Sequence, residues 1–182
     1  MSRARQTYVA LLYSVVLTPQ KRVGMADLRA MAEDLGHQNV RTLVSSGNLV
    51  FEAEKQEISG LETRLEAGFE RVFSRHVEIV VRSADAWRRL AAANPFPVES
   101  ASTPDQVAVR IMRSPVPADA GDRLREAAAP DEKFAIVDGD PWVLFSRERP
   151  NSRLLAAVNH KRLGIGTSRN WNTVRKLAEM IG

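Results

Sequence analysis

The apolar run over residues 8–17 restricts the fold more than any other part of the sequence. It holds β-branched and aromatic residues, no glycine, and an apolar side chain at almost every position, which is typical of a buried β-strand. A strand of this kind needs cover on both faces. We therefore expect a central strand of a sheet whose second face is covered by the rest of the chain or by a partner subunit, and we favour the chain itself.

The segments that follow alternate between helical and extended patterns. Apolar residues recur at helical spacing up to Gly36, which can cap a helix, and Ser46-Gly47-Asn48 forms a turn between two short extended runs. The expected elements are a helix over 25–36, strands over 40–45 and 49–52, a helix over 58–72 and a strand over 76–82. Together with the first strand they give the order β-α-β-β-α-β, which is that of a ferredoxin-like plait.

A short helix from residue 84 and a linker with three prolines, over 94–104, separate this plait from the second half of the chain. The later pattern predicts a strand over 106–112, a helix over 119–128, a hairpin of 133–137 with 142–146 about Asp138-Gly139, and helices over 154–163 and 174–181. The predicted fold class is therefore α+β: a ferredoxin-like plait over 1–82, then a second, smaller α+β subdomain over 83–182 that ends in two basic helices. The second half echoes the first in topology only.

Composition excludes several classes of protein. The chain has no cysteine, so disulfides, thiol nucleophiles and thiolate metal sites are absent, which fits a reducing compartment. Its three histidines are widely separated, and we expect neither a metal nor another cofactor. The run over 8–17 is shorter than the about 20 apolar residues of a membrane span. Arg3 and Arg5 precede this run, but no cleavage site follows it, so we expect a cytoplasmic protein that does not enter membranes.

Positive charge concentrates at the end of the chain. The formal net charge is only +4, but residues 147–182 contain eight basic residues against two acidic ones. This distribution favours either a surface that faces an anion or a solvated helical face.

The strongest local signal for a binding site is the stretch 164–173 (GIGTSRNWNT). A glycine-containing loop that leads into the last helix would leave backbone N–H groups and a partial positive charge open to phosphate or carboxylate. In the alternative interpretation Asn170 caps the helix, Trp171 packs into the core and Arg169 pairs with a carboxylate. The candidate ligand-binding residues are Thr167, Ser168, Arg169, Asn170, Trp171 and Asn172, joined by Ser46, Gly47 and Asn48, which turn formation alone also explains.

No catalytic motif is present, so whether the chain is an enzyme stays open. The best hypothesis is a binding module for an anionic ligand, either a phosphate-containing small molecule or nucleic acid, at the N-terminus of the last helix. The alternatives are a small-molecule enzyme with a polar cleft and an interaction scaffold. The sequence leaves open whether the protein is a monomer or a homodimer.

Three strings carry a family resemblance: residues 42–51 (TLVSSGNLVF), 94–97 (NPFP) and 166–177 (GTSRNWNTVRKL). They resemble, in the same order, the T-x-x-S-G-N-V-x-F, N-P-F and T-R-N-W-N-T-V-x-K-L strings of domain of unknown function 1697, a bacterial family. The resemblance implies an α+β fold with plait-like halves and no established activity. Members usually begin with A-L-L-R-G-I-N-V-G-G, where this chain has residues 10–19 (ALLYSVVLTP). If that loop helps to form a shared site, this protein has lost part of it.

Overall fold

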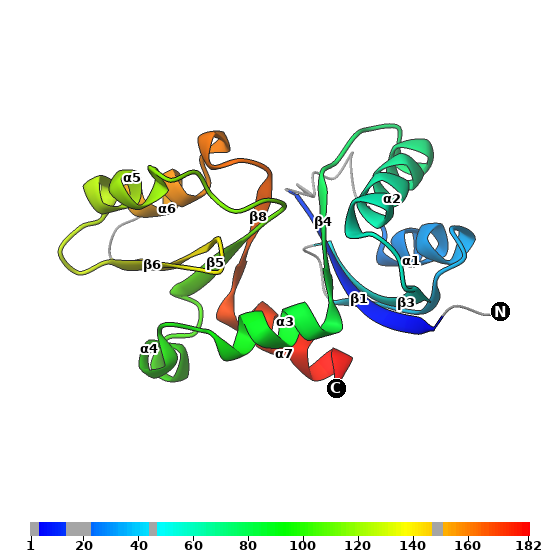
Figure 1. Cartoon of the computed structure of the whole chain (residues 1–182), viewed down its shortest axis with the longest axis horizontal. Coiled ribbons are helices and arrows are strands. Elements are labelled where there is room, and N and C mark those ends of the chain that lie inside the picture. Colours follow the sequence, from blue (N-terminus) through cyan, green and yellow to red (C-terminus); the bar gives the residue numbers. More distant parts are fainter. Residues whose placement is uncertain (1–3, 14–22, 44–46, 147–150) are drawn as a thin grey trace. The chain divides into compact units, whose positions relative to one another are not determined.

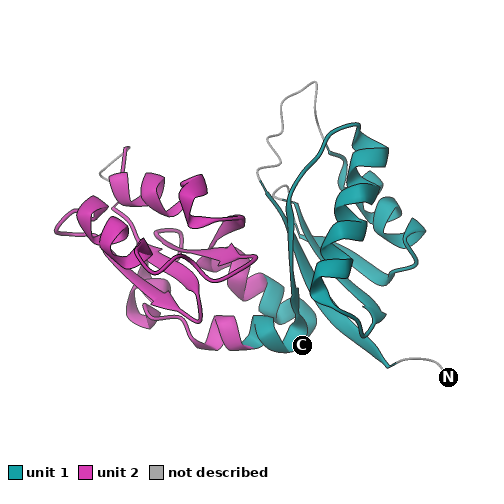
Figure 2. Ribbon diagram, turned by 45° about the horizontal axis from the view of Figure 1, so that its top comes forward, with its two compact units in different colours: residues 1–88, 177–182 teal, residues 89–176 magenta. Residues whose placement is uncertain are grey.

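The structure is a computed structural model that describes residues 4–13, 23–43, 47–146 and 151–182. The chain forms two compact units: unit 1 consists of residues 1–88 and 177–182, and unit 2 of residues 89–176 (Figure 2). The division into domains after residue 82 stays a prediction. The compact units divide after residue 88, and the last residues of the chain return to unit 1. Within the described ranges, no helix has the length and apolar character needed to cross a membrane.

Unit 1 is a ferredoxin-like plait. Its four strands form an antiparallel sheet in the order β2-β3-β1-β4, with α1 and α2 together on one side (Figure 1). The predicted β-α-β-β-α-β order is confirmed. The elements are β1 (Arg5–Leu12), α1 (Met25–Asp34), β2 (Gln38–Leu43), β3 (Asn48–Glu54), α2 (Ile58–Phe73) and β4 (Ile79–Ser83), and α3 (Ala84–Ala92) follows.

The apolar run of the first strand explains the core of unit 1. Tyr8 and Leu12 belong to the cluster that also contains the buried hydrophobic residues of α1 and α2. Val9 and Leu11 point to the opposite face and are fully buried as well. Both faces of β1 are therefore removed from water, as its sequence predicts. Residues 14–17 of the apolar run lie outside the described residues.

The outer edge of β4 is hydrogen-bonded to side chains of α2. β4 is an edge strand, and only its inner side pairs with β1. On the outer side, Glu62 Oε1 accepts from the Val81 N–H at 3.0 Å, and Glu66 Oε1 accepts from the Ile79 N–H at 2.9 Å. Two carboxylates one helical turn apart thus satisfy donors that would otherwise be open to another strand.

Unit 2 contains a second, complete plait. Its sheet has the order β6-β7-β5-β8, which repeats the order of the first sheet strand for strand. The elements of this unit are α4 (Pro97–Ser102), β5 (Val107–Met112), α5 (Ala120–Ala127), β6 (Lys133–Val137), β7 (Asp140–Leu144), α6 (Arg153–Val158), the 3₁₀ helix η1 (Lys161–Leu163) and β8 (Gly166–Asn170). The last helix, α7 (Trp171–Ile181), begins in unit 2, and its residues from Leu177 on belong to unit 1.

Two details of unit 2 test the sequence patterns directly. The hairpin about Asp138-Gly139 is confirmed: both residues have positive φ, at 50° and 85°, as a tight two-residue hairpin turn requires. The helix expected over 154–163 is present but shorter, with a separate 3₁₀ helix over 161–163, and the loop expected after it is wrong. α6 ends at Val158, and residues 166–170 form strand β8, paired with β5.

Candidate functional site

Arg169 lies in β8, with its side chain on the same face of the sheet as that of Thr167. Its Nη1 donates to Thr167 Oγ1 at 2.7 Å and to the Ser168 carbonyl at 2.8 Å. Only 8% of Arg169 is exposed, and this burial lowers the pKa of its guanidinium to about 10. Arg169 therefore donates within β8 from a buried position, and its role as a ligand contact stays a prediction.

The start of α7 follows the alternative interpretation in one respect. Asn170 Oδ1 accepts from the Thr173 N–H at 3.1 Å, so Asn170 caps the helix and occupies one of its free donors. Trp171 is half-buried, and its ring centroid lies 6.2 Å from that of the buried Trp142. Part of the indole of Trp171 remains accessible.

A cleft of about 490 Å³ lies beside the first turns of α7. Trp171 and Asn172 line it, and so does Arg175, which follows them by four and three residues and therefore shares their face of the helix. Sequence reasoning missed Arg175, although its helical spacing from Trp171 could have found it. The other lining residues come from the end of α3, from α4 and from the segments beside α4: Ala91, Ala92, Asn94, Pro97, Ser100, Ala101 and Pro104.

The wall opposite α7 is shaped by the asparagine-proline turn noted in the sequence. Asn94 Nδ2 donates to Ser100 Oγ at 2.7 Å, and Asn94 Oδ1 accepts from the Phe96 N–H at 2.9 Å. Pro97 follows as the first residue of α4, a position where its missing N–H costs nothing. The side chain of Asn94 is therefore used to fix the turn, and the cleft keeps a defined wall.

The lining residues determine what the cleft can hold. Alanines, prolines and one indole provide apolar contact, Asn172 provides a carboxamide and Arg175 a guanidinium. Of the ten lining residues none is Asp, Glu or His, so the described part of the cleft holds no side chain typical of a general base. Its chemistry suits the binding of a ligand with a flat or apolar body and an anionic group.

None of the other predicted binding residues that the structure describes lines this cleft. Ser46 lies outside the described residues. In unit 1, the Gly47 carbonyl accepts from the Leu12 N–H at 2.9 Å, and the fully buried Asn48 donates to the Leu43 carbonyl at 3.4 Å. Ser168 belongs to unit 2 and donates to Asn159 Oδ1 at 2.5 Å. All of these described contacts hold turns and strands together.

Metal ligands do not gather anywhere in the described ranges: no group of three or more His, Asp or Glu side chains could hold an ion there. His160 is exposed, and its Nδ1 accepts from the Arg162 N–H at 3.2 Å. His37 is buried in unit 1. The two histidines therefore have different, local environments.

Residues 5–142 match the model of a family described as protein of unknown function (DUF1697). The chain belongs to this family. The resemblance noted in the sequence is confirmed, and the matched region includes the TLVSSGNLVF and NPFP strings but ends before the string over 166–177.

A solved structure extends the comparison of this DUF1697 chain to 98% of its length. The conserved bacterial protein SP0830 from Streptococcus pneumoniae is similar with a TM-score of 0.77 at 21% sequence identity, over 98% of this chain and 100% of that one. At this identity the similarity shows the fold, which is α+β as predicted. No curated protein matches the chain.

Proposed function

We propose that this DUF1697 protein binds an anionic small molecule in the cleft beside α7. The observation that carries the proposal is the presence of Trp171, Asn172 and Arg175 on one helix face, along a cleft of about 490 Å³. That volume falls in the range of small-molecule sites, which is roughly 300–1,000 Å³. The indole stacks on the flat part of the ligand, and the guanidinium binds its anionic group.

The ligand class follows from the charges and the position of the helix. Arg175 carries a positive charge, and the first turn of α7 adds the partial positive charge of a helix N-terminus. A phosphate-containing small molecule matches both features and the size of the cleft. The proposed ligand contacts do not include the Thr173 N–H, which donates to Asn170, or the buried Arg169. They therefore differ from the contacts expected from the sequence.

A thermal-shift screen of the full chain against nucleotides, sugar phosphates and carboxylates tests this function. A ligand present at one hundred times its Kd stabilises the native state by about 2.7 kcal/mol, which gives a rise in Tm. For the ligand found, Arg175→Gln should weaken binding about tenfold or more, because a charge-assisted hydrogen bond contributes about 1.5–3 kcal/mol. Lys176→Gln is the matched control, since Lys176 is the exposed neighbour of Arg175 and does not line the cleft.

The two variants decide between the site and a general charge effect. Loss of binding in Arg175→Gln with normal binding in Lys176→Gln supports the cleft. Equal losses in both variants, or no Tm shift across the whole panel, contradict the proposal.

A further inference from the structure

The segment over 159–164, between α6 and β8, has a fixed shape that comes from its own backbone. The Leu163 N–H donates to the His160 carbonyl at 3.1 Å, and the Gly164 N–H donates to the Lys161 carbonyl at 3.0 Å. Leu163 is buried in a small apolar cluster of unit 2. The segment is therefore anchored by one inward side chain while its neighbours face solvent.

A buried arginine side chain forms hydrogen bonds with the backbone at both ends of this segment. Arg110, only 3% exposed, donates from Nη1 to the Val158 carbonyl at 3.0 Å and from Nη2 to the Gly164 carbonyl at 2.9 Å. On the neighbouring strand, Gly166 leaves room for this side chain, because a Cβ there would lie 2.9 Å from Arg110 Nε and 2.6 Å from Met112 Sδ. A rigid support of this kind lowers the conformational entropy lost when a ligand binds.

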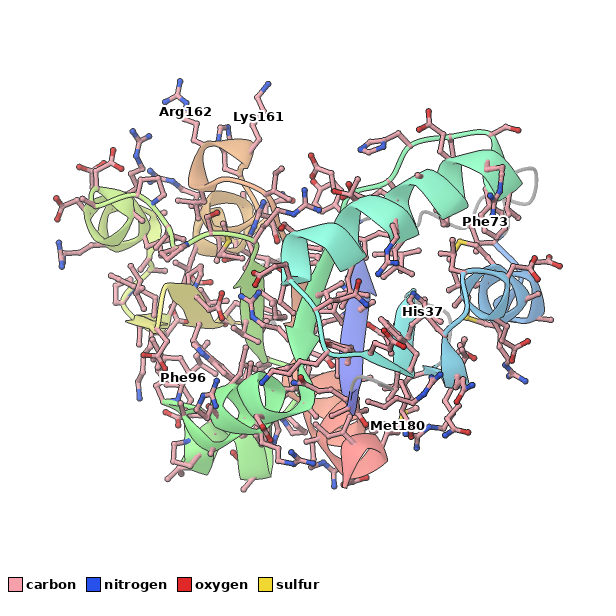
Figure 3. The ribbon with its side chains drawn as sticks, turned by 45° about the vertical axis from the view of Figure 1, so that its right-hand side comes forward. His37, Phe73, Phe96, Lys161, Arg162 and Met180 are labelled. Carbon is pink, nitrogen blue, oxygen red and sulfur yellow. The ribbon has the colours of Figure 1, made fainter. Side chains whose placement is uncertain are left out.

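The segment presents positive charge to solvent. Lys161 and Arg162 extend away from η1 (Figure 3) and are exposed. Neither side chain forms an ion pair with any residue that the structure describes. Arg113 lies beside the same segment because the pairing of β5 with β8 continues there: its N–H donates to the Ile165 carbonyl at 2.8 Å.

A second cleft of unit 2, of about 320 Å³, lies at this junction. Two of its described lining residues are arginines and none is acidic. The residues are Arg113, Ser114, Pro115, Pro117, Arg162, Leu163, Gly164 and Ile165. None of them lines the cleft beside α7, so the two clefts have separate contact sets.

We propose that this second cleft is an anion site that binds a phosphate group through the guanidinium group of Arg162, with Arg113 as a second positive charge in the cleft wall. The guanidinium of Arg162 offers a planar pair of N–H donors that matches two phosphate oxygens. Lys161 adds positive charge beside the cleft, which attracts an anion before contact. The phosphate comes from a phosphorylated small molecule or from a nucleic-acid backbone, and both present the same oxygens.

Calorimetric titration of the full chain with inorganic pyrophosphate tests the site. Arg162→Gln should reduce the affinity about tenfold or more, because it removes a charge-assisted pair of hydrogen bonds. Arg125→Gln is the matched control: it removes the same charge from unit 2, at an exposed position of α5 where Arg125 pairs with Asp122 at 2.6 Å. Arg162→Lys keeps the positive charge but not the planar guanidinium. Its affinity for pyrophosphate should therefore lie between those of Arg162→Gln and Arg125→Gln.

A parallel titration with a short oligothymidylate distinguishes the sources of phosphate. Saturable binding of pyrophosphate that depends on Arg162 assigns a small ligand. If only the oligonucleotide binds, depends on Arg162 and weakens steeply with salt, the source is a nucleic-acid backbone. Equal losses in Arg162→Gln and Arg125→Gln, or no binding of either probe, overturn the site.

The same titrations on Arg175→Gln, which removes the proposed anion contact of the α7 cleft, keep this proposal apart from the function of that cleft. The affinity for pyrophosphate or oligonucleotide should be unchanged in that variant. A loss there, with full affinity in Arg162→Gln, contradicts the second site and leaves the α7 cleft as the anion site.

Discussion

Arg169 and Arg162 come from the same basic end of the chain and have opposite environments. Arg169 is buried in β8 and donates to its own strand, whereas Arg162 is exposed on η1. The sequence shows only that both are arginines near glycines, so it favoured Arg169 as the ligand contact. The difference arises because β8 turns the Arg169 side chain onto a buried face of the sheet.

His37 in unit 1 gives a prediction about pH. Its ring stacks on Phe51 with centroids 4.4 Å apart, it is 6% exposed, and its Nε2 has no hydrogen-bond partner among the described residues (Figure 3 labels it). Burial, and then the positive charge of Arg64, lower the pKa of His37 from 6.5 to about 4. The folded state therefore favours the neutral ring, and the unfolded state takes up a proton first as the pH falls.

Stability should be constant above about pH 7 and fall as the pH drops from 6.5 towards 4. Between about pH 7.5 and about pH 5 the loss attributable to His37 is about 2 kcal/mol. Urea unfolding at these two pH values, compared with His37→Leu, measures it: the variant should lose less stability on acidification. An equal loss in both proteins would show that His37 does not carry this pH dependence.

At the scale of elements, β8 is a strand that the pattern of apolar residues does not predict. Its sequence, GTSRN, contains no apolar residue, so neither alternation nor β-propensity marks it as a strand. It forms because β5 offers a partner edge, with Ile111 paired to Thr167 and Val109 to Arg169. The strands of unit 1 were predictable because they contain apolar residues, and the hairpin at Asp138-Gly139 because its turn residues are specific.

The carboxylates of α2 give a prediction for the edge strand β4. Glu62 is 4% exposed and accepts from the Val81 N–H at 3.0 Å. Glu62→Leu leaves this buried donor without its acceptor and should reduce the free energy of unfolding by about 1–3 kcal/mol. Glu62→Gln keeps an acceptor oxygen and should cost clearly less.

Chemical denaturation measures both variants, and amide hydrogen exchange gives a local readout. Protection of the Val81 amide should fall in Glu62→Leu and largely persist in Glu62→Gln. If the two variants are equally stable and equally protected at Val81, Glu62 does not serve as the acceptor of this edge.

At the scale of the whole molecule, the chain carries the same plait topology twice. The sequence predicted one complete plait and an incomplete echo, because only β8 was missing from the second. For the candidate site it predicted Trp171 and Asn172 but not Arg175 or the opposing wall. Those residues lie near one another only because the turn at Asn94 and the start of α7 meet in unit 2, a tertiary contact that periodicity does not encode.

The most direct test of the α7 cleft follows the three indole N–H signals of the ¹⁵N-labelled chain during titration with the ligand that raises Tm. Trp87 and Trp142 are at most 1% exposed, whereas Trp171 is half-buried and lines the cleft. A Trp171→Phe variant assigns its signal by removing it. We predict that the Trp171 signal shifts progressively to saturation, with much smaller changes at the other two. A ligand that saturates the protein and leaves the Trp171 signal unmoved would contradict the proposed site.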